Sequence, residues 1–558
     1  MDVTGGLPAV ARSLGLDRHR TLAFAGLTGV LTGVAVAGFD GVTNGLIYDR
    51  VREAPLAAQV LLPTLGLAVA ALALSWLGHG ATPATSDAYI KNFHERGRRL
   101  DLRPFWGRLV AGVATLGTGG AMGFEGPSMY IGASVGAALQ RRWPRYFSRA
   151  DSKVLLVAGA AAGVAAIFKA PATGAIFALE VPYRDDTARR MLLPALIAAA
   201  TGYLTFVALL GTEPLFAVAG SPPFDFKELG GAVLLGLVCG AGARLYAAVL
   251  TRAKQWATRT NPVVRVSVAG ASLAVLAFGS NRLFDQPLAL GSGYASLAWV
   301  TQGSHALTLI VALFGFRLAA TACTVGGGGV GGLFVPLVVA GAIVGNATAS
   351  IVHDTSTLFP LIGVAAFLAA GYRTPLAGVM FVAETTGRPG FIVPGLIAAV
   401  ASQLVMGDVS LSPYQVAGRV GHLERRFQLT IGAALDADVA TVPSDTTLAE
   451  FYDHQLLVNR RIEVPVVDGA TYRGMVSVYG LQSIPMADWG AHVMSEILDA
   501  ERPTVGPLAL LEDAIRIMER ADVDQLAVLD GPTFIGVVTT AGIIGLGHIL
   551  DETVDDAP

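Results

Sequence analysis

Long apolar stretches separated by short polar or basic segments run through the first three quarters of the chain. They recur at about residues 23–47, 56–77, 106–122, 153–167, 192–211, 228–251, 263–279, 306–325, 337–351, 358–370 and 391–406. A helix needs about 20 apolar residues to cross a bilayer, and several of these stretches are shorter or are interrupted by Gly and Pro. We therefore expect an α-helical integral membrane protein with broken, half-spanning helices. In lipid, a break is tolerated only where protein buries it or it lines a cavity, so each break marks a candidate solute site.

The pattern changes after residue 430. Residues 463–477 and 525–539 resemble each other at an offset of 62, and each copy reads as strand, turn and strand. Asp468-Gly469 and Asp530-Gly531 lie at the two turns, and Asp-Gly between apolar runs is a strong hairpin signal. Helical patterns cover residues 447–457 and 507–521. We expect a small α/β module, made of two related copies, over residues 435–550.

Charge divides the chain at the same place. Of the 558 residues, 53% are hydrophobic and 15% are charged, against roughly 25% charged in soluble domains. Residues 431–558 contain 21 acidic and 6 basic residues, whereas residues 1–430 contain 21 acidic and 33 basic ones. A basic, apolar region followed by an acidic one indicates a multi-pass cell-membrane domain over residues 23–420, with basic cytoplasmic loops. A cytoplasmic N-terminal segment, residues 1–22, would precede it.

Several function classes are excluded. Two cysteines cannot form a disulfide framework, and the first apolar stretch is too long for a signal peptide and is followed by further spans. His94-Glu95 begins like a zinc-protease motif but lacks the second histidine. No basic region rich in aromatic residues suggests nucleic acid. We expect no enzyme, no catalytic residue, no metal site and no cofactor.

The membrane part contains an internal repeat. Residues 168–180 resemble residues 372–384 at an offset of 204, and each copy ends in a glutamate, Glu180 or Glu384. A second match has an offset of 209 and pairs Gly126-Pro127, Gly132 and Gly136 with Val335-Pro336, Gly341 and Gly345. Two related halves with Gly/Pro breaks at matching positions predict a site between them near the middle of the membrane.

Glu125 is the sharpest candidate for chemistry. It lies in the sequence Gly123-Phe124-Glu125-Gly126-Pro127, between an apolar run and a helix-breaking pair. An ionisable group at membrane depth is costly and is a functional hypothesis by default. Such a carboxylate could exchange a proton, or compete with an anion for amides at a helix N-terminus. A structural, neutral or salt-bridged glutamate is the alternative.

A glycine-rich run is the second candidate. Gly326 to Gly329, Val330 and Gly331 precede Gly332-Leu333-Phe334-Val335-Pro336. Exposed amides there would bind an anion. A nucleotide loop is the competing interpretation, but no Lys-Ser/Thr pair accompanies the glycines; close helix packing is the other alternative.

These two motifs, in this order and spacing, resemble the CLC family of chloride channels and proton/chloride exchangers. There, a G-x-E-G-P motif supplies the gating glutamate, and a G-x-F-x-P motif supplies backbone amides to chloride. The resemblance implies an inverted-repeat bundle with broken half-helices, a homodimer with one pore per subunit, and a cytoplasmic CBS-domain pair in the tail. It assigns gating and proton transfer to Glu125 and anion binding to Phe124, Gly126, Leu333 and Phe334, framed by Gly123, Pro127, Gly332 and Pro336.

The chain departs from the family pattern in several places. The family has another anion-binding motif earlier in the chain, usually G-S-G-I-P, which contributes a serine hydroxyl. In this chain that motif is degenerate over residues 78–87, where Ser86 or Thr85 could supply the hydroxyl. Phe124 replaces the usual arginine, and Val181 stands where exchangers often have a second, proton-carrying glutamate. Tyr414 is the nearest candidate for the pore tyrosine, and an interfacial tyrosine is the alternative.

In the tail, CBS pairs that bind adenine nucleotides commonly carry an aspartate where this chain has Gly480 and Gly542. We therefore do not expect adenine nucleotide binding, although Ser477, Thr539 and Thr540 could still make polar contacts. A structural or dimerising role is our interpretation.

The sequence thus predicts transport of chloride or a similar small anion across a lipid membrane, gated by Glu125 and coupled to protons. Lower external pH should open the path. A passive channel, gated by voltage or pH, is the first alternative because of Val181. A non-conducting membrane sensor with a CBS tail is another. A metal-cation transporter is the third, but the apolar spans lack a carboxylate cluster.

Overall fold

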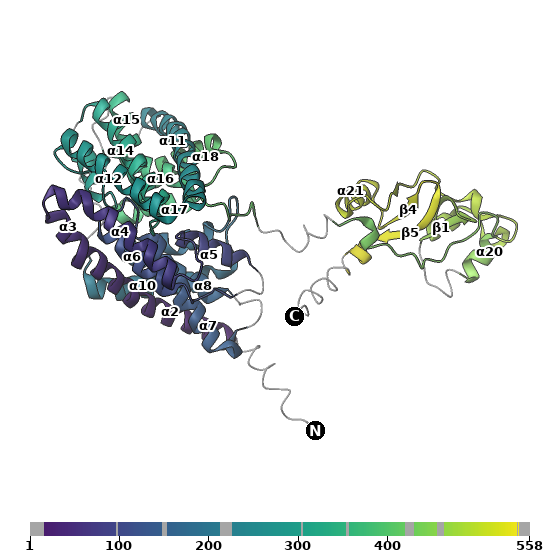
Figure 1. The fold of residues 1–558 in the computed structure, drawn as a ribbon. Coiled ribbons are helices and arrows are strands. Elements are labelled where there is room, and N and C mark those ends of the chain that lie inside the picture. The colour runs from purple at the N-terminus through teal and green to yellow at the C-terminus, as the bar shows by residue number, and fades with distance from the viewer. Residues whose placement is uncertain are drawn as a thin grey trace, which may run out of the picture. The chain divides into compact units, whose positions relative to one another are not determined.

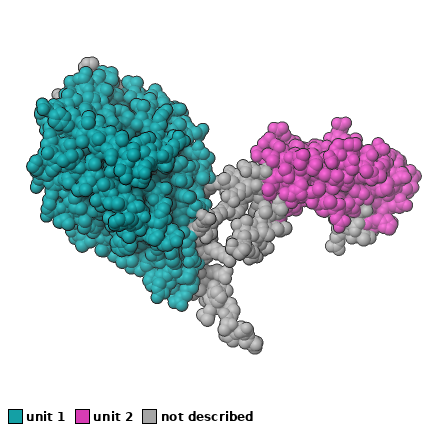
Figure 2. All heavy atoms as spheres, viewed as in Figure 1, with its two compact units in different colours: residues 1–419 teal, residues 420–558 magenta. Residues whose placement is uncertain are grey.

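The computed structural model describes residues 16–95, 99–147, 153–212, 226–302, 305–352, 357–418, 429–454, 463–543 and 545. The chain separates into two compact units, residues 1–419 and 420–558 (Figure 2). Most of the expected N-terminal segment, parts of the helical pattern at 447–457 and the end of the expected 435–550 module lie outside the described residues.

The first unit is helical and is built from two runs of helices (Figure 1). The first run is α2 (Leu16–Asp40), the π-helix η2 (Gly41–Tyr48), α3 (Asp49–Glu53), α4 (Leu56–Leu77), α5 (Thr85–His94), α6 (Phe105–Gly117), α7 (Glu125–Arg142), α8 (Val154–Phe168), α9 (Pro171–Glu180) and α10 (Leu192–Leu210). The second run is α11 (Phe226–Arg259), α12 (Pro262–Phe284), α13 (Tyr294–Thr301), α14 (Leu307–Gly326), α15 (Phe334–Val352), α16 (Leu358–Tyr372), α17 (Pro375–Thr386) and α18 (Ile392–Met406).

Helix length varies as the apolar pattern predicts. Within the described residues, eight helical stretches are long and apolar enough to cross a membrane. α8 and α16 are equally apolar but have only 15 residues each, or about 22 Å at 1.5 Å per residue. Helices of this length cannot cross a hydrocarbon layer of about 30 Å, so the prediction of half-spanning helices is confirmed.

The Gly/Pro breaks are helix ends. Gly126 and Pro127 lie in the first turn of α7, while Pro171 and Pro375 are the first residues of α9 and α17. Proline has no N–H, and the first-turn N–H groups have no partner within the helix, so it starts a helix without losing a hydrogen bond. α14 ends at Gly326, where the glycine-rich run begins.

The two runs of helices contact each other reciprocally. Gly123 and Gly332 form an antiparallel bridge in which each amide donates to the other carbonyl, at 2.9 and 2.7 Å. Each half also donates one amide to a threonine hydroxyl of the other half: Ala121 to Thr324 at 3.1 Å and Val330 to Thr115 at 3.0 Å. The paired residues are 209 apart in the sequence, so the repeat generates a local two-fold relation between the halves.

Matching glycines let the helices of each half approach closely. A Cβ on Gly132 of α7 would lie 1.9 Å from the Gly159 carbonyl oxygen of α8, and one on Gly159 would lie equally close to Gly132. In the other half, Gly341 of α15 and Gly363 of α16 stand in the same relation at 2.4 Å. Small residues at such crossings are typical of membrane helix pairs.

The second unit contains the strands β1 (Glu463–Asp468), β2 (Thr471–Ser477), β3 (Thr504–Val505), β4 (Gln525–Asp530) and β5 (Thr533–Thr539), with the helices α20 (Leu448–Phe451) and α21 (Leu511–Ala521). The strand order is β1-β2-β5-β4-β3. Both predicted hairpins are confirmed, β1 with β2 and β4 with β5. Gly469 and Gly531 have φ of +66° and +61°, which the Asp-Gly turns require.

Candidate functional site

Two helix N-termini meet at the Gly123–Gly332 bridge. α7 begins at Glu125, two residues after the bridge, and α15 begins at Phe334, also two residues after it. An α-helix leaves its first amides without partners and carries about half a positive charge at its N-terminus. Two such ends at one place form a favourable position for an anion, buried inside the helical unit and built from both halves.

The Glu125 carboxylate occupies this position. Its side chain is 1% exposed, and its Oε1 accepts a hydrogen bond of 2.5 Å from the Phe334 amide at the start of α15. The Val335 amide and its own amide also contact the carboxylate. Oε2 has no hydrogen-bond partner within the described part of the chain. The carboxylate of one half therefore caps the helix of the other, as a bound anion would. We call these amides, with Glu125, the amide site.

Glycine on both sides makes room for the carboxylate. A Cβ on Gly332 would lie 2.0 Å from Oε1, and a Cβ on Gly123 would lie 2.0 Å from Oε2. Any side chain at either position would displace the Glu125 side chain. The motif glycines thus serve the site directly, as well as the bridge.

The preceding glycine run does not supply free amides, contrary to the prediction. The amides of Gly327, Gly328 and Gly329 donate to the carbonyls of the last turn of α14, at 2.8, 3.0 and 2.9 Å. The Val330 amide donates to Thr115, and the Gly332 amide donates to Gly123. These glycines allow a tight reversal between α14 and α15, and the amides that face the site begin with Leu333 and Phe334.

The first turn of α5 brings two hydroxyls to the same region. Thr85 is 1% exposed, and its Oγ1 has no hydrogen-bond partner among the described residues. A Cβ on Gly126 would lie 2.7 Å from that oxygen, so Thr85 borders the amide site. Ser86 is also buried. The degenerate motif at residues 78–87 therefore still presents hydroxyls.

Tyr372 brings a further hydroxyl, which the sequence analysis missed. It is the last residue of α16 and is 3% exposed, and its side chain meets both the Leu333 amide and Ser86. Tyr414 does not join them. It is 42% exposed, and the Lys91 ammonium lies over its ring at 5.7 Å from the centroid. The repeat itself held a signal, because Tyr372 matches Phe168 and differs from it by one hydroxyl.

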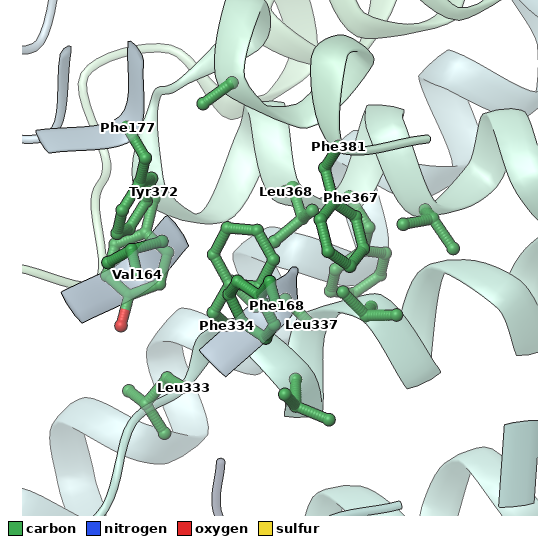
Figure 3. Packing of buried hydrophobic residues seen from close by; sticks show 14 of the residues in the cluster. Val164, Phe168, Phe177, Leu333, Phe334, Leu337, Phe367, Leu368, Tyr372 and Phe381 are labelled. Carbon is green, nitrogen blue, oxygen red and sulfur yellow. The ribbon is translucent and has the colours of Figure 1, made fainter. Parts of the chain in front are cut away.

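Phenylalanine rings line one side of the amide site. Phe334 packs against Phe168 and Phe177, with ring centroids 4.6 and 5.1 Å apart, and against Phe381 at 5.0 Å (Figure 3). Phe124 is 4% exposed, and its ring packs against Phe39 at 6.2 Å. Phe124 and Phe334 thus place their backbones at the amide site while their rings fill the core and exclude water from it.

The repeated glutamates cap each other's helices. Glu384 accepts the amides of Ala172 and Thr173 at the start of α9, at 2.9 and 2.8 Å, and also the Thr173 hydroxyl at 2.8 Å. Glu180 accepts the amides of Leu376 and Ala377 at the start of α17, at 3.1 and 2.9 Å. This reciprocal arrangement supports the structural interpretation of both residues.

Val181 is fully buried, and its carbonyl accepts the Gln415 side-chain amide at 2.8 Å. Within the described ranges, no three His, Cys, Asp or Glu residues gather as metal ligands would. In the tail, Gly480 and Gly542 lie three residues beyond the ends of β2 and β5.

Comparison with known proteins is consistent with this geometry. The family model described as voltage gated chloride channel matches residues 65–407, and that of the CBS domain matches residues 493–548, the second copy of the tail repeat. The H(+)/Cl(-) exchange transporter ClcA of Vibrio vulnificus strain YJ016 is 28% identical over 405 residues, which cover 68% of this chain and 85% of that protein.

Solved structures share the fold. A CLC-type fluoride/proton antiporter superposes with a TM-score of 0.63 at 23% identity, over 72% of this chain and 98% of that one. A eukaryotic CLC transporter superposes with a TM-score of 0.57 at 19% identity, over 93% of this chain and 97% of that one.

Proposed function

This chain belongs to the voltage gated chloride channel family, and on that premise we propose that it exchanges chloride, or a similar small anion, for protons across the cell membrane. Its membrane region matches that family model over residues 65–407, and its tail matches the CBS domain over residues 493–548. The observation that carries the proposal is the position of the Glu125 carboxylate, whose Oε1 lies 2.5 Å from the Phe334 amide at the start of α15.

Partial charges suit transport better than full ones. The amide site is made of backbone N–H groups at two helix N-termini, each equivalent to about half a charge. Amide dipoles can replace part of an anion's hydration and still release it, whereas a lysine or arginine would hold it more tightly. The buried rings of Phe124 and Phe334 strengthen the dipoles by excluding water.

Glu125 acts as both gate and proton carrier in this proposal. Ionised, the carboxylate takes the place of the anion and closes the path. Protonated, it no longer competes for the amides, because it has lost its negative charge, and it leaves them to the transported anion. Lowering the external pH therefore opens the path, and each cycle of binding and release moves a proton on the same side chain.

We also propose that the transporter is a homodimer. α10 and α18 carry exposed apolar side chains, including Leu204 at 60% and Leu404 at 77% exposure. Such faces suit lipid or a second copy of the chain, and the tail would add a dimerising module. Single-molecule photobleaching in liposomes at high dilution tests this, since a dimer gives two bleaching steps per particle.

A passive channel is the second candidate. The observation that favours it is Val181, a fully buried apolar side chain at the position where exchangers of the family often carry a proton glutamate. In a channel, Glu125 would still gate, but no stoichiometric proton flux would accompany the anion.

The experiment is anion efflux from liposomes, with chloride and external pH recorded together. An exchanger takes up protons as chloride leaves, and Glu125→Gln abolishes the proton movement while chloride still flows. Chloride flux without proton movement in the unmodified protein identifies the channel. Absence of flux with chloride, fluoride and nitrate alike would contradict both and favour the non-conducting sensor.

A further inference from the structure

A histidine is built into the protein at the far end of α5, away from the amide site. His94 is the last residue of α5, and its side chain is half-buried. Its Nε2 lies 2.7 Å from the Pro182 carbonyl oxygen. Its ring meets the rings of Phe93 and Tyr183 edge to face, with centroids 5.0 and 5.3 Å apart. These contacts hold the imidazole in one orientation, next to the segment that follows the buried Val181.

The contact with Pro182 determines which nitrogen of His94 can take a proton. A carbonyl oxygen only accepts hydrogen bonds, so Nε2 carries the proton of the neutral ring and Nδ1 carries the lone pair. Within the described ranges, Nδ1 has no hydrogen-bond partner. Imidazole has an ordinary pKa of about 6.5, so it gains and loses a proton near neutral pH. Neutral His94 is therefore a base with its lone pair on Nδ1.

α5 joins His94 to the amide site. Thr85 in its first turn lies beside Gly126, and His94 ends the helix. Ten helical residues cover about 15 Å, which is half of a hydrocarbon layer of about 30 Å. The basic residues of the segment 96–103 follow directly in the sequence, and such segments face the cytoplasm. α5 thus leads from the amide site toward the cytoplasmic side.

Buried hydroxyls lie along this helix. Thr85 and Tyr89 are four residues apart, so they share a face of α5, and they are 1% and 0% exposed. The Tyr89 hydroxyl donates to the Ala178 carbonyl at 2.6 Å, whereas Thr85 Oγ1 has no partner in the described residues. Tyr183, which packs against His94, is buried as well. Because a hydroxyl both donates and accepts, it can receive one proton and give up another.

Other titratable groups gather around the end of α5. They are Tyr183 from the segment after α9, Lys153 from the segment before α8, and Lys91 and Glu95 from its own segment. Lys91 and Glu95 pair with each other at 3.8 Å, and the Lys153 ammonium donates to the Asn92 side chain at 2.9 Å. The ordinary pKa values of tyrosine, lysine and glutamate lie far from neutrality. Of the groups named, the histidine is the one suited to proton transfer near pH 7.

We propose that His94 is a proton-transfer residue, which exchanges protons between the cytoplasmic solution and Glu125. The inference rests on the proposed function, since it applies to an exchanger and not to a channel. Neutral His94 accepts a proton at Nδ1 and becomes an imidazolium. It returns to the neutral form when a proton leaves the ring for the hydroxyls along α5, each of which accepts one proton and gives one up.

The proton ends on the Glu125 carboxylate. Its Oε2 has no hydrogen-bond partner in the described part of the chain, so it can take a proton without losing a bond. For each proton that His94 takes from solution, one reaches Glu125, and the groups between them return to their starting state. The same steps in reverse carry a proton from Glu125 to the cytoplasm.

The test compares His94→Gln with His305→Gln in the full-length protein. His305 is a matched control, because its Nε2 also lies 2.7 Å from a backbone carbonyl, that of Trp299, and its ring also packs against an aromatic side chain. Glutamine keeps an N–H donor but does not titrate. Proton and chloride fluxes are recorded together in liposomes. We expect His94→Gln to lower the proton flux about 10-fold or more while chloride still flows, and His305→Gln to keep the ratio of the unmodified protein.

A carboxylate at the same position gives a second readout. In His94→Glu the residue titrates again, with an ordinary pKa about two units lower. The pH is varied equally on both sides of the liposome, because the protein inserts in both orientations. We expect proton flux to return, with its pH profile moved to lower pH by up to about two units. A histidine that only supported the Pro182 segment would leave the profile unmoved.

Three results would overturn the role of His94. An unchanged ratio of protons to chloride in His94→Gln leaves exchange intact and removes His94 from it. Equal losses in His94→Gln and His305→Gln would reflect packing alone. If His94→Gln does not elute as a folded protein, His94→Glu decides, and an unmoved pH profile there contradicts the proposal. Chloride flux without proton movement in the unmodified protein contradicts the proposed exchange itself, and the role of His94 with it.

Discussion

The two halves of the membrane unit agree at some positions and differ at others. They agree at the helix contacts, Gly132 with Gly159 and Gly341 with Gly363, and at the reciprocal caps of Glu180 and Glu384. They differ at two pairs of helix ends: the first residues of α7 and α15, and the last residues of α8 and α16.

The differing positions gather at the candidate sites. Glu125 begins α7 where Phe334 begins α15, and Phe168 ends α8 where Tyr372 ends α16. A duplicated fold needs the same contacts in both copies, whereas an anion path needs a carboxylate gate and a hydroxyl once. We therefore propose that the positions that are equal in the two halves hold the fold and that the unequal positions serve transport.

The largest effect is expected at the glycine contacts. Gly132→Val and Gly341→Val each place a side chain against a facing carbonyl oxygen, 1.9 and 2.4 Å from the Cβ. A backbone contact cannot yield without separating the helices, so both variants should lose the folded protein. Size-exclusion chromatography in detergent measures this. Gly38→Val, where a Cβ meets nothing within 4 Å, is the control, and a folded Gly132→Val would contradict the contact.

A smaller loss is expected at the paired glutamates. Glutamine at position 180 or 384 points an NH₂ group at amides that are themselves donors. Each change should destabilise the protein by about 1 to 3 kcal/mol, with the larger loss at Glu384, which also holds the Thr173 hydroxyl. Thermal unfolding in detergent checks this, against exposed Glu53→Gln as control. Equal melting temperatures in all variants would contradict the stabilisation of the helix N-termini by Glu180 and Glu384.

A functional change with little loss of stability is expected at Gly123. In Gly123→Ala the new Cβ would stand 2.0 Å from Glu125 Oε2, and its three nearest atoms all belong to that flexible side chain, so the carboxylate must leave the amide site. Chloride efflux at neutral pH should rise several-fold and lose much of its pH dependence. Gly315→Ala, where a Cβ meets nothing within 4 Å, should behave as the unmodified protein. A variant that still closes at neutral pH would show that Glu125 gates from elsewhere.

The sequence predicts the helix starts well, because Gly and Pro mark them locally. The resemblance to the CLC family places Glu125 and Phe334 at one site, and the structure brings them together. The free amides were predicted less well. A glycine run indicates that the backbone can approach another group closely. It does not show whether the amides of Gly327 to Gly329 are free, because that depends on how α14 ends. In the structure these amides donate to the carbonyls of the last turn of α14.

Tyr372 could not be placed from the sequence for a different reason. Its neighbours Ser86 and Leu333 lie 286 and 39 residues before it, and they meet it only through the packing of α5, α15 and α16. The resemblance makes Tyr414 the nearest candidate for the pore tyrosine, but the neighbouring Gln415 takes the buried place instead.

The smallest effect is expected in the tail, where the two copies also differ. The amide and hydroxyl of Ser444, with Arg473, hold the pKa of Asp468 below its usual value. At the matching position of the second copy, Asp530 faces neither group, since Gly506 and Ile535 occupy the corresponding places. Because the folded pKa of Asp468 is depressed, its stabilisation is present at neutral pH and is lost as the pH falls through that lowered pKa.

Hydrogen exchange in the full-length protein measures this. Asp468→Asn should speed exchange slightly in β1 and β2 at pH 7, and the difference should shrink as the pH falls through the lowered pKa of Asp468. Asp530→Asn should leave β4 and β5 unchanged. Equal effects in both copies would mean that the turn itself, not the contacts of Asp468, is responsible.

The most direct test of this contrast between positions shared by the two halves and positions that differ between them makes the same substitution at three glutamates. Glu125→Gln, Glu180→Gln and Glu384→Gln are compared for melting temperature and for the ratio of protons to chloride moved in liposomes. We expect Glu125→Gln to abolish proton movement, and the other two to lower the melting temperature while keeping the ratio of protons to chloride. A changed ratio in Glu384→Gln, with an unchanged ratio in Glu125→Gln, would contradict this contrast.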